Sequence, residues 1–284
     1  MKRLTLPNIR YDDVLDKIVA GITGIPDLSN KVRQQSEGIL SANQEYKALG
    51  RAGELYTVPA VIGDGNTDVV GTLKKQDFLK LYENYFVKKS KPARCVYDKL
   101  MVAANDHCPF CGGIGRPRNL DHYLPKALFP QFSVSPENLI PACRDCNMDG
   151  KADAFARVAG DQVLHPYLDN EKFYNEQWIS ATCSIDFDHI GVIEYKVTPP
   201  GHWSDDDKSR VKTHFESFDI AKVYSREAAT RITTFATQIR QLLELGITED
   251  EAKSIILIPA IDNAPFINHW ERLMCLALYE YPLI

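Results

Sequence analysis

The chain has 284 residues, of which 44% are hydrophobic and 25% charged, and its formal net charge at pH 7 is −5. This length can bury a sizeable core without disulfides, and the composition excludes a disordered or low-complexity chain. The acidic balance means that any contact with nucleic acid needs a local basic face. Without a signal peptide or a long apolar run, we expect a protein of the reducing cytoplasm that makes no membrane contact.

The first part of the chain is predicted to be mostly helical. Apolar residues at helical spacing favour a helix over residues 11–20, and N-cap residues at 27–30 favour a second helix that ends near Ile39. Residues 57–71 contain the turn sequence Gly-Asp-Gly-Asn and are expected to form a loop. Further helices are predicted over 73–87 and, after Pro92, over 93–105.

Two Cys-x-x-Cys pairs follow, Cys108 with Cys111 and Cys143 with Cys146. Each pair offers two thiolates from one tight turn, and two such turns complete a tetrahedral Zn²⁺ shell. Four cysteines leave no open coordination position, so we expect this zinc to be structural.

The segment between the two pairs carries polar residues that could bind a metal ion or act in catalysis. Residues 118–122 and 138–141 are predicted to be two short strands, and a helix is expected from Asn147 to about Ala156. Asp121 offers a hard oxygen ligand for Mg²⁺, and the imidazole of His122 is a suitable general base near neutral pH. Adjacent strand residues point to opposite faces, so the two side chains need not do the same job.

These residues resemble the HNH endonuclease family, the zinc-stapled branch of the ββα-metal nucleases. The resemblance implies that His122 activates a water, that Asp121 and Asn147 bind a catalytic Mg²⁺ or Mn²⁺, and that Asn138 orients the histidine. Asn147 stands where the family has His or Asn, and Asn is expected to give a weaker metal site. The sequence pattern DHYLPK…NLIPACRDCN…K is also similar to that of HNH nucleases of Septu and retron-type anti-phage systems. This similarity implies an ATPase partner.

Basic residues gather around this segment, whereas acidic residues gather later in the chain. We expect the basic residues to contact the phosphates of DNA, although a charge run is usually a solvated face. The predicted contact residues are Arg116, Arg118, Lys126, Arg144 and Lys151.

The C-terminal part is predicted to hold a β-hairpin over 178–197 and then helices. The helical stretch 208–245 is expected to break near Phe218, Thr248 to Glu251 form a capping box, and a last helix covers 267–279. Pro259 is expected to interrupt the chain before that last helix. His165 is interpreted as a buried, hydrogen-bonded loop histidine, although it could reach the metal site.

The prediction is therefore an α+β protein, mainly helical, with a central zinc-bound ββα nuclease module at 93–170. A helical region at 1–92 precedes it, and the hairpin with further helices follows at 171–284. Two other functions stay open, because a zinc module of this kind can bind nucleic acid without catalysis or can scaffold a partner protein.

Overall fold

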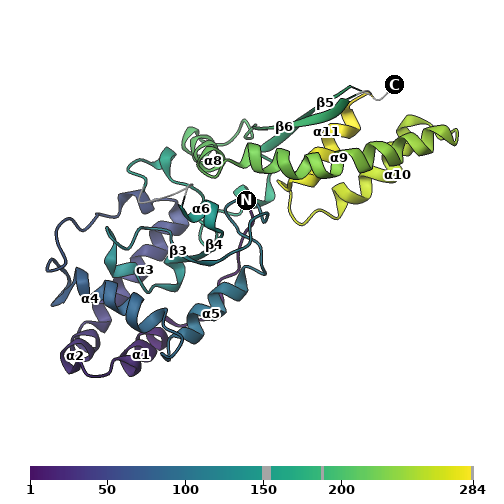
Figure 1. Cartoon of the computed structure of the whole chain (residues 1–284). Coiled ribbons are helices and arrows are strands. Elements are labelled where there is room, and N and C mark those ends of the chain that lie inside the picture. The colour runs from purple at the N-terminus through teal and green to yellow at the C-terminus, as the bar shows by residue number, and fades with distance from the viewer. Residues whose placement is uncertain (149–154, 187–188, 283–284) are drawn as a thin grey trace.

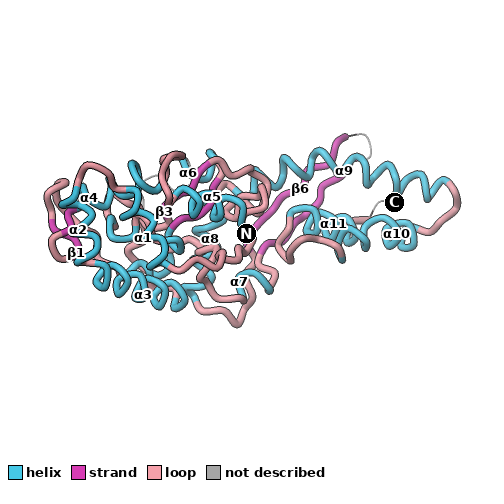
Figure 2. Tube along the Cα trace, turned by 90° about the horizontal axis from the view of Figure 1, so that it is seen from below, coloured by secondary structure: helices cyan, strands magenta, loops and turns pink. Residues whose placement is uncertain are grey.

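The computed structural model describes residues 1–148, 155–186 and 189–282. Within these residues the protein is mostly helical, with three small antiparallel sheets of two strands each. The molecule is elongated: the N-terminal helices form one end, and the last hairpin and last helices form an arm at the other (Figures 1 and 2). The mixture of helices and small sheets agrees with the predicted fold class at this coarse level.

The N-terminal region is helical as predicted, with one correction. The expected second helix is divided at Gln35, and its later part continues well past Ile39. Gly53 ends that later helix at φ +75°, a left-handed conformation that glycine adopts without strain. The three helices are α1 (Tyr11–Gly21), α2 (Pro26–Gln34) and α3 (Ser36–Ala52).

The stretch before the cysteines differs more from expectation. A 3₁₀ turn leads into the predicted loop, and the loop itself contains a strand. The predicted helix over 73–87 begins as a strand and ends in a π-helical turn. π-helical turns are rare in proteins, and those that occur are often found at functional sites. The elements are η1 (Leu55–Thr57), β1 (Asp68–Val70), β2 (Leu73–Lys74), α4 (Lys75–Lys80), η2 (Leu81–Phe86) and α5 (Arg94–Ala103).

Two short strands at the centre carry the predicted site. β3 (Asn119–His122) pairs antiparallel with β4 (Leu139–Ala142), so that His122 lies opposite Leu139. The next helix, α6 (Arg144–Met148), begins three residues earlier than predicted because it starts directly after Cys143. The remainder of the predicted helix falls largely on residues 149–154, outside the described residues. Short turns around them are η3 (Pro130–Phe132), η4 (Pro136–Asn138), η5 (Ala159–Asp161) and α7 (Lys172–Asn175).

The C-terminal elements follow the sequence pattern closely. The hairpin is confirmed, the helical stretch breaks at Asp219 with φ +47°, and the Thr248 hydroxyl accepts a hydrogen bond from the Glu251 N–H at 3.4 Å. Pro259 lies inside a helix, contrary to expectation. The elements are β5 (Ile179–Asp186), β6 (His189–Val197), α8 (Asp205–Ser217), α9 (Ile220–Glu244), α10 (Glu249–Asp262) and α11 (Trp270–Glu280).

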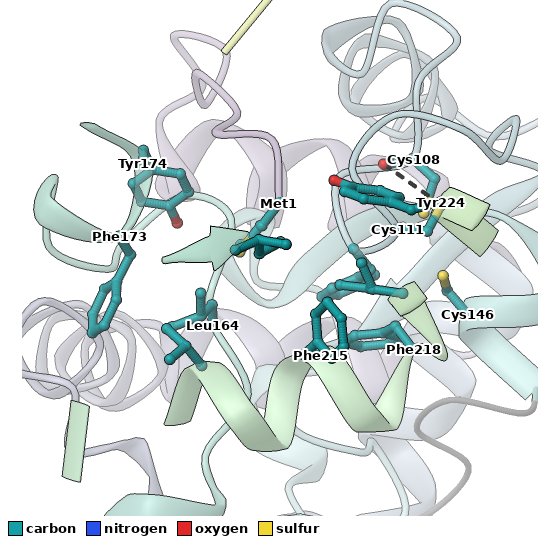
Figure 3. Packing of buried hydrophobic residues seen from close by; sticks show 14 of the residues in the cluster. Met1, Cys108, Cys111, Cys146, Leu164, Phe173, Tyr174, Phe215, Phe218 and Tyr224 are labelled. Atoms are coloured by element: carbon teal, nitrogen blue, oxygen red, sulfur yellow. Dashed lines mark hydrogen bonds between the residues drawn. The ribbon is translucent and has the colours of Figure 1, made fainter. Parts of the chain in front are cut away.

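The small central sheet is buried on both sides. Leu120 and Leu139 join an apolar cluster formed by the N-terminal helices, whereas Ile140 and Ala142 join a second cluster shared with the C-terminal elements. In that second cluster Tyr224 of α9 lies beside the cysteines (Figure 3). The sheet is therefore held rigidly between two cores. In the described part of the chain, no helix has the length and apolar character needed to cross a membrane.

Candidate functional site

The four predicted zinc ligands come together in the structure. Cys108, Cys111, Cys143 and Cys146 are buried, and their sulfur atoms all lie within 4.8 Å of one another. In a tetrahedral zinc centre with Zn–S bonds of about 2.3 Å, neighbouring sulfurs are roughly 3.8 Å apart. The cluster thus has the ligand type, number and spacing of a closed metal site such as that of structural zinc.

Glycines shape the first knuckle of this cluster. Gly112 and Gly113 have φ of +68° and +91°, which lets the chain turn back after Cys111. The N–H of Gly115 donates to the Cys111 sulfur at 3.2 Å. A Cβ at position 115 would lie 2.5 Å from the Cys143 sulfur, so a side chain there would displace a ligand.

The thiols of the cluster perturb one another strongly. Hydrogen bonding from Cys108 and the other two thiols holds the pKa of Cys143 far below its usual value. Hydrogen bonds with Cys108, Cys111 and Cys143, together with burial, raise the pKa of Cys146. Four buried thiols cannot all ionise next to one another without a compensating cation, whereas a bound metal deprotonates its thiol ligands.

A cleft of about 420 Å³ lies beside the cluster and contains three of the four residues predicted for catalysis. Asp121 and His122 come from β3, and Asn147 comes from α6. Asp121 and His122 alternate in burial along the strand, yet both line the cleft because the strand ends at His122. The wall is completed by Tyr82, Asn119, Leu120, Pro125, Lys126, Ala127 and Met148.

The imidazole of His122 is held in a defined orientation. His122 is 8% exposed, and its Nε2 lies 2.9 Å from the carbonyl oxygen of Ser133. A carbonyl only accepts, so in the neutral ring the proton sits on Nε2 and the lone pair on Nδ1. Tyr82, from the π-helical turn, packs edge-on against the ring at 4.4 Å between centroids.

Asn138 fixes the chain that leaves the histidine. Its Oδ1 accepts from the N–H of Leu124 at 2.7 Å and from the hydroxyl of Tyr46 at 3.0 Å. Its Nδ2 donates to the carbonyls of Leu124 at 3.0 Å and Phe132 at 3.2 Å. The fully buried amide therefore uses two donors and two acceptors to tie both ends of the 123–132 segment together.

A buried polar network that the sequence did not indicate supports Asn138. The Tyr46 hydroxyl lies 3.1 Å from Nε2 of His165, whose Nδ1 accepts from the N–H of Tyr167. The N–H of His165 donates to Asp169, and Asp169 forms a buried ion pair with Arg210 of α8 at 2.7 Å. His165 is therefore the buried, hydrogen-bonded residue that was expected. The long sequence separations explain why no local pattern reveals this network.

The basic residues predicted to contact DNA have different surroundings. Lys126 pairs with Glu83 at 2.5 Å at the cleft, and Arg116 pairs with Asp106 at 2.9 Å. Arg118 and Arg144 are exposed at the start of β3 and α6. Lys151 lies outside the described residues. Lys126 is thus the one of these five that lines the cleft within the described residues.

One comparison with known proteins is informative about ancestry. The chain is 38% identical over 293 residues to protein ea31 of Escherichia phage lambda, and the match covers 99% of this chain and 98% of that protein. The chain belongs to the ea31 family. No family model matches the chain, and no solved structure does. The name ea31 states no activity, so the function of this member of the ea31 family is inferred from the site.

Proposed function

We propose that this protein is a metal-dependent endonuclease of the HNH type that hydrolyses phosphodiester bonds in DNA. The observation that carries the proposal is the cleft in which Asp121, His122 and Asn147 meet beside the four-cysteine cluster. A module that merely binds nucleic acid needs no base next to a carboxylate and an amide oxygen.

In this mechanism His122 acts as the general base. While its Nε2–H donates a hydrogen bond to the Ser133 carbonyl, the ring accepts a proton from water on Nδ1 and the water oxygen attacks the phosphorus. The bond from phosphorus to the 3′ oxygen breaks and a solvent water protonates that oxygen, which leaves a 5′ phosphate and a 3′ hydroxyl. Asp121 and Asn147 offer the oxygen ligands for Mg²⁺ or Mn²⁺, which would supply charge neutralisation at the phosphate and the leaving oxygen.

Other groups of the cleft orient the reactants. Asn138 fixes the backbone of Leu124 and so sets the course of the chain directly after His122. Tyr82 limits rotation of the imidazole by packing against it. Lys126 lines the cleft and pairs with Glu83, so a phosphate that binds in the cleft would compete with that carboxylate for the ammonium group. Together these contacts hold the base and leave a cation close to the substrate.

The test is cleavage of plasmid DNA with Mg²⁺ or Mn²⁺ by wild type and by His122→Gln. Glutamine can still donate to the Ser133 carbonyl but cannot act as a base near neutral pH. We expect the rate of cutting to fall by at least about 10²-fold, the size of a general-base contribution. Asn147→Ala should also cut more slowly, with partial recovery at high Mn²⁺.

The matched control is His202→Gln, since His202 is an exposed histidine paired with Glu176 and lies outside the cleft. It should cut as fast as wild type. Zinc content and the melting temperature should be similar in all variants. Wild-type cutting by His122→Gln would show that the histidine is structural, and the non-catalytic binding module would then be the better reading.

The narrower roles implied by the resemblance are proposed with the nuclease. They are an anti-phage effector role and control by an ATPase partner. Co-purification with the products of neighbouring genes, followed by a plaque assay with wild type and His122→Gln, tests both. If the protein purifies alone in every co-purification, it has no such partner. If cells with wild type and cells with His122→Gln give equal plaque counts, the protein is not an anti-phage effector.

A further inference from the structure

The amide of Asn119 is a polar group of the cleft that the mechanism above does not use. Asn119 is the first residue of β3, it is half-buried, and it lines the cleft together with Asp121. Among the described residues, neither its Oδ1 nor its Nδ2 has a hydrogen-bond partner, and both atoms are open to solvent. This position therefore offers an amide oxygen and two N–H donors to a group bound in the cleft.

The strand places Asn119 and Asp121 on the same face. Side chains alternate along a strand, and both residues are more exposed than Leu120 between them. Residues two apart in a regular strand are roughly 6.6 Å apart along its axis, so two short polar side chains can turn toward one cation. Asn119 thus lies on the same face as the proposed metal ligand Asp121, one strand repeat earlier.

The sheet register brings Asn119 near the helix that carries Asn147. Asn119 is paired with Ala142, the last residue of β4, and from there the chain passes through Cys143 into α6. The N–H of Asn147 donates to the Cys143 carbonyl at 3.1 Å, so Asn147 lies one turn beyond that junction. Asn119 is therefore the residue of β3 next to the junction, and both asparagines line the cleft with Asp121.

The charges of the cleft favour the start of β3 for a metal ion. Asp121 is the one carboxylate among the described residues that line the cleft. The ammonium of Lys126 lies 5.2 Å from the ring centroid of Tyr82, which in turn packs on His122. The His122 end of the cleft therefore already holds a cationic group, which leaves the side of Asp121 toward Asn119 for a divalent cation. Such a cation prefers oxygen ligands, which both side chains supply.

We propose that Oδ1 of Asn119 is a third protein ligand of the catalytic metal, beside Asp121 and Asn147. The inference rests on the proposed function, because the nuclease mechanism calls for a divalent cation in this cleft. Mg²⁺ is octahedral and usually keeps several waters, so three protein oxygens leave positions for water and for a substrate phosphate. The added oxygen compensates in part for the neutral amide at position 147, which was expected to give a weaker metal site.

The test measures Mn²⁺ binding without DNA, from the loss of the free Mn²⁺ signal in electron paramagnetic resonance. Each protein is titrated with its structural zinc bound, and binding that Asp121→Ala abolishes is assigned to the cleft. Asn119→Ala should raise the Kd for Mn²⁺ at least about tenfold, since loss of even an outer-shell partner costs about 10–100-fold. Asn119→Asp replaces the amide oxygen with a charged oxygen at the same place and should lower the Kd at least about threefold.

The matched control is Asn84→Asp, since Asn84 is an exposed asparagine of η2 that does not line the cleft. It adds the same charge and should leave the Kd for Mn²⁺ unchanged. Equal Mn²⁺ affinity in Asn119→Ala and wild type, weaker binding by Asn119→Asp, or no Mn²⁺ binding that depends on Asp121 would each overturn the proposal. Because Asn119→Asp hardly changes the size of the side chain, it decides the question even if Asn119→Ala does not fold.

Plasmid cleavage separates this inference from the nuclease. Mn²⁺ binding that depends on Asn119, without cleavage by wild type, would refute the nuclease alone. Cleavage by wild type, with Mn²⁺ binding that Asn119→Ala leaves unchanged, would refute the third ligand alone. Where both proposals hold, Asn119→Ala should cut more slowly than wild type at low Mn²⁺ and recover at high Mn²⁺.

Discussion

The amide of Asn138 shows how one side chain can organise a site from outside the cleft. It does not line the cleft, yet its four hydrogen bonds reach Leu124, Phe132 and Tyr46. The sequence suggested an orienting role through the family resemblance, and the structure gives the contacts through which it would act. Tyr46, which links Asn138 to His165, was not indicated by the sequence, because a lone tyrosine on a helix is usually a core residue.

This arrangement predicts a graded effect of substitution on stability. Asn138→Ala leaves the Leu124 N–H and carbonyl buried without their partner, and should lower the free energy of unfolding by about 3 kcal/mol. Tyr46→Phe removes two hydrogen bonds, those to Asn138 and His165, and should cost about 2 kcal/mol. Urea unfolding at constant zinc concentration measures both.

Tyr279→Phe is the control, because Tyr279 is 38% exposed and shares its hydroxyl hydrogen bond with Ser254 at the surface. Its stability should stay within about 0.5 kcal/mol of wild type. If Asn138→Ala is as stable as wild type, the amide does not hold the loop.

At the scale of elements, the two knuckles join β3, β4 and α6 into one unit. Cys143 follows β4 and directly precedes α6, so the metal would fix the angle between the strand and the helix that carries Asn147. The central sheet has four residue pairs, and two-stranded sheets of that size are marginal by themselves. We therefore expect the cleft to depend on the metal.

Cys143→Ser tests this dependence. Structural zinc contributes on the order of 10 kcal/mol of apparent binding free energy in small peptides, so the variant should lose zinc, melt at a lower temperature and cut more slowly. Cys95→Ser is the control, since Cys95 is exposed and outside the cluster. Metal analysis should find about one zinc per chain in wild type and Cys95→Ser. Wild type without zinc would contradict the assignment.

Periodicity and caps predicted many of these elements. The helix at 11–20, the last hairpin, the break near Phe218 and the capping box at Thr248 were all confirmed. These features depend on neighbours within a few residues, which a single sequence displays directly. The cysteine spacing likewise predicted the cluster, because knuckle geometry is local.

The predictions that were wrong failed for a different reason, since they depend on contacts between distant residues. The stretch 73–87 has the composition of a helix, but the N–H of Lys74 donates to Asp77 at 3.0 Å, so the helix begins only after a short strand. Pro259 stays within α10, where packing against α9 and α11 outweighs the local preference of proline to end a helix. The hydrogen bond between His122 and the Ser133 carbonyl also depends on tertiary structure, which no local pattern reports.

At the scale of the whole molecule, buried histidines connect distant parts of the chain. His214 of α8 accepts from the N–H of Leu164 at 3.3 Å, and its Nε2 lies 3.0 Å from the Phe110 carbonyl in the first knuckle. Burial lowers the pKa of His214 well below its usual value and lowers the pKa of His269 to about 4. Both rings are therefore neutral in the folded protein at pH 7.

This predicts a loss of stability in acid. The folded-state pKa values lie below the unfolded value near 6.5, so the unfolded chain takes up more protons as the pH falls below about 6.5. Each histidine should then lower the free energy of unfolding by up to about 1.4 kcal/mol per pH unit. The free energy of unfolding in urea is measured between about pH 7.5 and pH 5 for wild type and His214→Leu, with zinc in excess. It should depend less steeply on pH in the variant. Equal slopes would show that His214 is protonated in the folded state.

The burial of the central sheet on both sides also governs how this protein can be divided. Phe110 stacks on Phe218 at 4.7 Å between centroids, Tyr46 packs on Phe132 at 4.8 Å, and a Cβ at Gly112 would meet the Tyr224 hydroxyl at 2.1 Å. Helices from both ends of the chain thus form the walls of the metal-binding segment. We expect a fragment cut out at residues 93–170 to expose these apolar faces to water and to aggregate, so the metal-binding segment should need the helices on either side of it in order to fold.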